Sequence, residues 1–243
     1  SRMVAMQELL AMEDDLAQKL LRELRLRLYP DPYGRGTTGS PESVQAISHR
    51  DVASHVEDYY VPENSIISIA GKIEFEAVTS IIENLFGDWE GALQSDIYQT
   101  PPRDGHHHIQ HESSQTQIGI VYPSVPYSHP DYFLARSAIG ILSDGMSSRL
   151  FTEVREKRGL CYTVYAMCHT IKEEGCVLAY AGTTTDRAQE TLDVMLAEIR
   201  RLGDGVFEDE LKRLKARMKT GLIMQQESSS SRSISMASDW HLL

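Results

Sequence analysis

The stretch from Ser147 to Tyr165, SSRLFTEVREKRGLCYTVY, most limits what this chain can fold into. Three apolar residues recur at helical spacing: Leu150, Phe151 and Val154. This spacing predicts a short helix whose charged residues face water. Gly159 should end the helix, because glycine enters the left-handed region without a Cβ penalty. The next segment, Cys161 to Met167, is β-branched and aromatic, which predicts a strand.

Two polar side chains flank this turn. Arg155 falls near the end of the helix and Tyr162 at the start of the strand, seven positions later, so both could point at one spot. A guanidinium and a phenol are donors that could hold a peptide carbonyl oxygen, or the oxyanion it becomes during acyl transfer. In the alternative, Arg155 pairs with Glu153 or Glu156 on a solvated helix face and Tyr162 packs beside the sheet. The spacing alone favours this alternative.

The run from Gly145 to Val164, G-x-SSRLF-x-EVREKRGL-x-Y-x-V, resembles the second-half signature of the M16 peptidases. This is the family of pitrilysin, insulinase and the mitochondrial processing peptidase. In that family an arginine and a tyrosine seven residues apart bind the substrate backbone near the zinc, and they match Arg155 and Tyr162. The resemblance therefore implies that these two residues bind the substrate carbonyl and the transition state.

The resemblance covers nearly the whole chain and implies an α+β fold of two related half-domains. Each half would be a mainly antiparallel sheet packed with helices, the first being truncated. Residues 1–91 would form the C-terminal part of the first half and 106–243 the second half, truncated at its C-terminus. The polar residues 92–105 read as a linker. A strand, Ala-Gly, helix pattern at Ile66 to Phe86 and again at Val177 to Leu202 suggests a repeat.

In the first segment, periodicity predicts helices over 1–28 and 74–86 and a strand over 65–70. Ser48, with Asp51 three positions later, predicts a capped helix start. Three residues of the 74–86 helix are expected to dock on the sheet: Ile81, Ile82 and Leu85.

The second segment should hold three strands: 115–122, 161–170 and 175–182. The last two are expected to form an antiparallel hairpin. Helices are expected over 129–143 and 186–202, and a long one from Phe207 onward.

In the M16 family, two histidines of an inverted HxxEH helix and a glutamate on a later helix hold the zinc. The resemblance places Glu8 on that glutamate position, although Ser1 replaces the usual first glutamate of the pattern. The alternative is an exposed helical glutamate. The HxxEH helix is absent from this sequence and is expected upstream of residue 1. Without it the zinc site is incomplete, and the fragment alone should be inactive.

A sequence similar to the HxxEH zinc motif follows the linker. It is HxxQH, formed by His107, Gln110 and His111. The stretch 106–111 follows a proline-glycine break and alternates, which predicts an edge strand rather than the helix that a zinc motif requires. The Gln110 amide could not act as a general base. We therefore reject this stretch as a catalytic zinc site; incidental metal affinity stays open.

The composition excludes some classes of protein. With 24 basic against 35 acidic side chains, the net charge of −11 argues against nucleic-acid binding. No apolar run approaches the roughly 18 residues of a membrane span. Three cysteines are predicted as small core residues: Cys161, Cys168 and Cys176. A disulfide between two of them stays open, and the sequence does not assign a compartment.

The resemblance thus implies a fragment of a zinc-dependent endopeptidase that hydrolyses extended or unfolded peptides. Such substrates would add to a sheet edge through backbone hydrogen bonds. The implied partners are a peptide or unfolded protein and either a second copy, as a homodimer, or an M16-like partner chain. The alternatives are a catalytically inactive M16-like partner or structural subunit, and a generic peptide-binding α+β domain. Retention of Glu8, Arg155 and Tyr162 together favours the peptidase.

Overall fold

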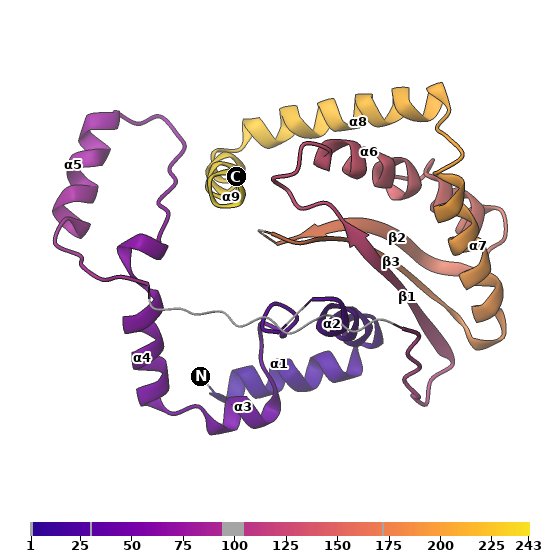
Figure 1. Cartoon of the computed structure of the whole chain (residues 1–243), viewed down its shortest axis with the longest axis horizontal. Helices are drawn as coiled ribbons and strands as arrows, with labels where there is room; N and C mark the ends of the chain where they lie inside the picture. The colour runs from indigo at the N-terminus through magenta and orange to yellow at the C-terminus, as the bar shows by residue number, and fades with distance from the viewer. Residues whose placement is uncertain (1, 30, 94–104, 172) are drawn as a thin grey trace. The chain divides into compact units, whose positions relative to one another are not determined.

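The computed structural model describes residues 2–29, 31–93, 105–171 and 173–243 (Figure 1). The chain forms two compact units. The first comprises residues 1–40 and 98–218, and the second comprises 41–97 and 219–243. Each unit is described separately below.

The first unit is built on a three-stranded antiparallel sheet with the order β1-β3-β2. Its strands are β1 (Gln115–Ser124), β2 (Cys161–Thr170) and β3 (Gly175–Thr184). Ala179 of the central strand lies opposite Ile120 of β1 and Ala166 of β2. The predicted strands and the β2–β3 hairpin are therefore confirmed.

One face of this sheet carries the hydrophobic core. Because successive strand residues point to opposite faces, Val177, Ala179 and Ala181 of β3 all enter the core. Helices α6 (Tyr132–Ser143) and α7 (Ala188–Arg201) cover this face (Figure 1). Both helices were predicted. They contribute Ile139, Leu142 and Met195 to the core.

The other face is covered by α2 (Leu16–Leu28), preceded by α1 (Arg2–Asp14) (Figure 1). We predicted one helix over 1–28, which is wrong, because Asp15 breaks it. The Asp15 side chain accepts hydrogen bonds from the backbone N–H groups of Ala17 and Gln18 and so caps a new helix. Gly119 of β1 allows α2 to come close, since a Cβ there would meet Leu24 at 2.4 Å.

The second unit contains only helices and irregular segments among its described residues. Its elements are α3 (Pro41–Ala46), α4 (His49–Tyr59), η1 (Pro62–Asn64), α5 (Phe75–Phe86) and α9 (Ser229–Leu242), and α8 (Glu208–Glu227) runs into it from the first unit. The predicted cap of α4 is confirmed. Ser48 and Asp51 form a reciprocal capping box, with N–H to oxygen distances of 2.7 and 3.2 Å.

The strand predicted at 65–70 is wrong, because this segment is irregular. A strand needs a neighbour to pair its backbone groups, and no described residues supply one. The described chain therefore holds one three-stranded sheet in one α+β half-domain, not the two sheets that we expected. Helix α5 forms as predicted, with Ile81 and Leu85 exposed and Ile82 half-buried. The described residues of this unit contain no sheet, so the predicted docking of these three residues on a sheet is also wrong. Two half-domains are therefore not observed in the described residues, most of the linker lies outside those residues, and the boundaries at 91 and 106 stay predictions.

Candidate functional site

The turn that we singled out joins a π-helix, η2 (Phe151–Glu156), to β2. The sequence predicted an ordinary helix here. Instead, the Lys157 N–H donates to the Thr152 carbonyl at 2.9 Å, which closes a five-residue turn. Fully buried Leu150 and Val154 anchor the segment. Gly159 ends it at φ +56°, as predicted. Such π-turns are frequent at functional sites.

The start of the helix is fixed by a buried arginine. The Arg149 guanidinium donates to both carboxylate oxygens of Glu210 at 2.8 Å. It also donates to the carbonyls of Arg201 and Gly205. The Arg149 guanidinium holds the pKa of the Glu210 carboxyl below its usual range. The hydrogen bonds of Arg149 therefore fix the position of the start of the helix that carries Arg155.

Tyr162 lies in a β-bulge at the start of β2. Cys161 pairs with Thr183 and Thr163 with Gly182, so Tyr162 is the extra residue of the strand. Bulges bend a strand and redirect a side chain. Tyr162 is 83% exposed, so the alternative in which it packs beside the sheet is not observed.

The Arg155 side chain lies against two aromatic rings. Its Cζ is 4.9 Å from the ring centre of Phe151 and 5.2 Å from that of Tyr162, within cation–π range. The structure thus brings together the two residues that the sequence analysis paired. Both donors are on one side of the same turn.

The alternative role for Arg155, a surface ion pair, is not observed among the described residues. Glu153 instead pairs with Lys157 and Arg158, each at 2.7 Å. Hydrogen bonds from these two side chains lower the pKa of the Glu153 carboxyl. The Arg155 guanidinium thus has no carboxylate partner within the described ranges, and its N–H groups can serve a ligand.

The cysteine beside the pair is not an activated nucleophile. Burial raises the pKa of the Cys161 thiol, which keeps it protonated near neutral pH. All three cysteines are free. Cys176 is fully buried, as predicted, and the other two are half-buried.

Glu8 is exposed on α1. Within the described residues, no group of three or more His, Cys, Asp or Glu side chains is placed to hold a metal ion. The described part of the chain therefore does not form a zinc site by itself. Within it, Glu8 makes no hydrogen bond, ion pair or ring contact with Arg155 or Tyr162. The ligand role of Glu8 stays a prediction.

The rejected HxxQH stretch is neither helix nor strand over 106–111. Its side chains are exposed, and the His108 ring lies 3.1 Å from the Gln110 amide oxygen. The absence of a helix over these residues is confirmed. The predicted edge strand is wrong here, since β1 begins only at Gln115.

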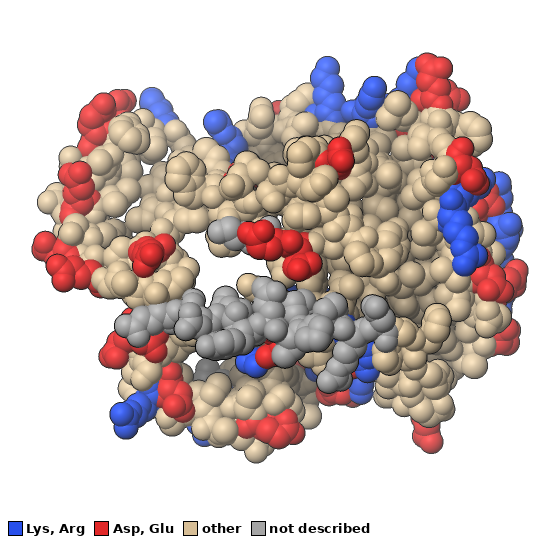
Figure 2. Space-filling model, in the orientation of Figure 1, with Lys and Arg blue, Asp and Glu red and all other residues tan. Residues whose placement is uncertain are grey.

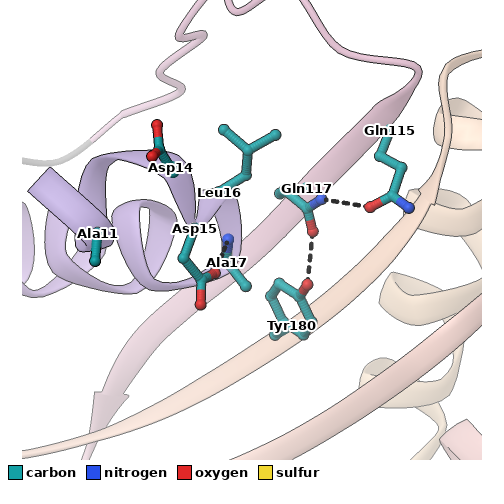
Figure 3. Close-up of a pocket in the computed structure, with 8 residues that line it drawn as sticks. All are labelled: Ala11, Asp14, Asp15, Leu16, Ala17, Gln115, Gln117 and Tyr180. Carbon is teal, nitrogen blue, oxygen red and sulfur yellow. Dashed lines mark hydrogen bonds between the residues drawn. The ribbon is translucent and has the colours of Figure 1, made fainter.

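A hollow of about 520 Å³ lies where α1 and α2 meet the edge of the sheet (Figure 3). The Tyr180 hydroxyl donates to the Gln117 amide oxygen at 2.6 Å, and Gln117 in turn donates to Gln115 at 3.4 Å. Asp15 is engaged in capping α2. Most of the polar groups of this hollow therefore bind one another. The sequence analysis missed this network, because only the β1–β3 register brings Gln117 and Tyr180 together.

A second buried network was also missed. The Tyr29 hydroxyl lies 2.7 Å from Nδ1 of His169 and 3.3 Å from Sγ of Cys176. Burial lowers the pKa of His169 and raises that of Cys176. Residues far apart in sequence form this cluster, so neither spacing nor a motif could have revealed it.

Charged side chains of both signs lie on the surface. On the face seen in Figure 2, Lys and Arg side chains are scattered among acidic ones and form no broad basic surface among the described residues. Of the described helices, none is both long and apolar enough to cross a membrane.

Comparison with known proteins decides the family. The sequence model of the protein family "Peptidase M16 inactive domain" matches residues 46–218 of this chain. The chain belongs to the M16 peptidase family. This excludes the alternative of an α+β domain unrelated to M16.

Several known proteins are similar to this chain in sequence or in fold. An uncharacterized zinc protease of Rickettsia felis is 26% identical over 92% of this chain and 55% of its own length. The chain spans about half the length of the curated relatives it matches. The crystal structure of the peptidase M16 inactive domain from Pseudomonas fluorescens superposes with a TM-score of 0.90 over 99% of this chain and 58% of its own, at 22% identity. A chain of complex III2 from Candida albicans superposes with a TM-score of 0.85 over all of this chain and 60% of its own, at 20% identity.

Proposed function

We propose that this chain supplies the substrate-holding part of a longer M16 zinc endopeptidase that acts on extended or unfolded peptides. One observation carries the proposal: the half-buried Arg155 guanidinium lies over the ring of Tyr162, which a bulge in β2 leaves exposed. The naming of relatives as zinc proteases supports the same reaction class.

The chemistry follows from the two side chains. The guanidinium is a planar, permanently charged group with five N–H donors, and the phenol adds one O–H donor. Aimed at a peptide carbonyl, they would stabilise the negative charge that develops on its oxygen during hydrolysis. An extended peptide has unpaired backbone groups that such donors can bind, whereas a folded protein has already paired them.

The zinc requires residues beyond this chain. Since the described residues form no metal site, we derive no catalytic step through the ion. Glu8 is the one ligand that we propose here, and the other ligands would lie outside this sequence. This chain alone should not hydrolyse peptides.

The test is cleavage of an unstructured fluorogenic peptide by the intact protein. Arg155→Ala should lower kcat/KM by about 10²- to 10³-fold, as expected when one donor to a developing oxyanion is lost. The matched control is Arg158→Ala, because Arg158 follows the same helix but pairs with Glu153. Equal activity of the Arg155 variant and the wild type would refute the proposal.

The second candidate is a catalytically inactive M16-like subunit that binds peptide or pairs with an active chain. The match to the peptidase M16 inactive domain and the likeness to a chain of complex III2 favour it. Zinc content distinguishes the two candidates. The peptidase should hold one zinc ion per intact chain and lose it in Glu8→Gln, but not in Glu76→Gln, an exposed glutamate on α5. A metal-free, inactive intact protein would establish the second candidate.

A further inference from the structure

Arg187 lies on the short 3-10 turn Thr185–Arg187 that joins β3 to α7. β2 and β3 are antiparallel, and Cys161 lies opposite Thr183. The turn before β2 and the turn after β3 therefore meet at the same end of the sheet.

The Arg187 guanidinium donates to two successive carbonyls of the turn before β2. Nη1 lies 2.9 Å from the Gly159 oxygen, and Nη2 lies 3.0 Å from the Arg158 oxygen. Hydrogen bonds from a charged donor are stronger than those between neutral groups. The two carbonyls are thus held by one planar group.

The next carbonyl is held from the same side. The Leu160 oxygen accepts from the buried Thr183 hydroxyl at 2.7 Å, and Thr183 lies 3.1 Å from the Thr191 hydroxyl. Three successive carbonyls, those of residues 158–160, therefore accept hydrogen bonds from side chains of the β3–α7 region.

This turn is the covalent link between Arg155 and Tyr162. It contains Gly159, whose backbone has the widest conformational freedom, and a Cβ at Gly159 would meet no atom within 4 Å. Packing around Gly159 therefore does little to restrict the turn, and hydrogen bonds must do so. A change in the Gly159 dihedral angles would separate the guanidinium from the phenol.

We propose that Arg187 is a positioning residue for the Arg155–Tyr162 pair. The two Nη groups of its guanidinium fix the carbonyls of Arg158 and Gly159. Through these carbonyls they fix the distance between the Arg155 guanidinium and the Tyr162 hydroxyl. Arg187 itself contacts the turn, not the peptide. This inference rests on the proposed function of that pair.

The experiment uses the intact protein and the same peptide assay. Arg187→Ala should lower kcat/KM about 10-fold, the scale expected when catalytic groups are displaced without being removed. Arg187→Lys should recover part of the loss, because an ammonium can bond one carbonyl but lacks the fork. The control is Arg200→Ala, an exposed arginine further along α7, which should leave cleavage unchanged.

Two readouts separate positioning from general stability. In an Arg155→Ala background, Arg187→Ala should cause no further loss; an equal loss in both backgrounds would overturn the proposal. Amide hydrogen exchange should quicken in Arg187→Ala at residues 158–163 and stay unchanged in β3. Unchanged exchange at 158–163 would also overturn the proposal.

The Arg155→Ala variant separates this inference from the proposed function. If Arg155→Ala cleaves normally, the proposed function and the positioning role both fail. Faster exchange in Arg187→Ala would then still establish that Arg187 holds the turn through the Arg158 and Gly159 carbonyls.

Discussion

The same sequence pattern occurs twice in this chain; both copies form the helix, but only one forms the strand. At Val177 to Leu202 it forms β3 and α7, and at Ile66 to Phe86 it forms an irregular segment followed by α5. Val177 is 2% exposed, whereas its counterpart Ile66 is 44% exposed. An apolar strand pattern in the sequence indicates which residues could be buried. Whether they are buried depends on pairing with neighbouring strands.

The two regions also differ in their polar groups. The sheet-containing unit holds a buried ion pair, Arg149–Glu210, and a buried tyrosine network around Tyr29. Among the described residues of the second unit, most hydrogen bonds are local, as in the capping box of Ser48, and the longer-range ones lie outside a hydrophobic core: the Ser68 hydroxyl donates to the Ser233 carbonyl, and the Leu93 N–H donates to the Glu63 carboxylate. Substitutions should therefore have large effects in the first region and small ones in the second.

The largest effect should come from Glu210→Ala. It leaves Arg149 buried without its partner, and breaking such a pair costs about 3–5 kcal/mol of unfolding free energy. Urea unfolding of the chain measures this cost. The matched control is Glu208→Ala, whose pair with Lys212 is exposed and contributes at most about 0.5 kcal/mol. Equal costs for the two variants would contradict the buried role of Arg149.

A core truncation tests the comparison directly. Leu142→Ala should lower the unfolding free energy by about 2–5 kcal/mol, because Leu142 is fully buried. Leu85→Ala, at a residue 70% exposed on α5, should change it by less than about 0.5 kcal/mol. The same pair of variants in the intact protein sharpens the result. A large cost of Leu85→Ala there would show that another part of the protein covers α5.

Loss of the α4 cap should have a local and smaller effect. Ser48→Ala removes the acceptor for the Asp51 N–H and should cost about 1 kcal/mol of helix stability. Amide exchange over residues 49–59 would report it. Faster exchange in β3 as well would show that the two regions unfold together, against our expectation.

The smallest effect should be a pH dependence from His169. Burial and the nearby Arg25 charge lower the pKa of His169 from 6.5, so the unfolded chain binds this proton more readily than the folded chain. The unfolding free energy should therefore fall as the pH drops below about 6.5, and not change above it through this group. His169→Gln should remove that part of the slope. An unchanged slope in the variant would contradict a neutral His169 in the fold.

Local signals in the sequence were enough to predict the sheet-containing half. The three strands, the hairpin and the Gly159 stop of that half depend on neighbours within a few positions, as does the Ser48 cap of the second unit, and all were found. The break at Asp15 was missed because the apolar spacing of α1 continues into α2, while a single carboxylate side chain ends the first helix.

The candidate site was predicted less completely. Arg155 and Tyr162 were identified by resemblance, but their stacking depends on a bulge and a π-turn that no spacing reveals. The contacts of Arg187 and Thr183 with the turn depend on strand register. Spacing alone favoured an ion pair of Arg155 with Glu153 or Glu156. Neither pair forms among the described residues, and Lys157 and Arg158 pair with the Glu153 carboxylate instead.

The most direct test of our central claim is a double-mutant cycle on peptide cleavage by the intact protein. It compares kcat/KM for Arg155→Ala, Tyr162→Phe and the double variant. If both side chains hold one carbonyl, each single variant should lose activity, and the double variant should lose much less than the product of the two losses. Independent, multiplying losses would contradict a shared site, and full activity of all three variants would refute a role in peptide binding.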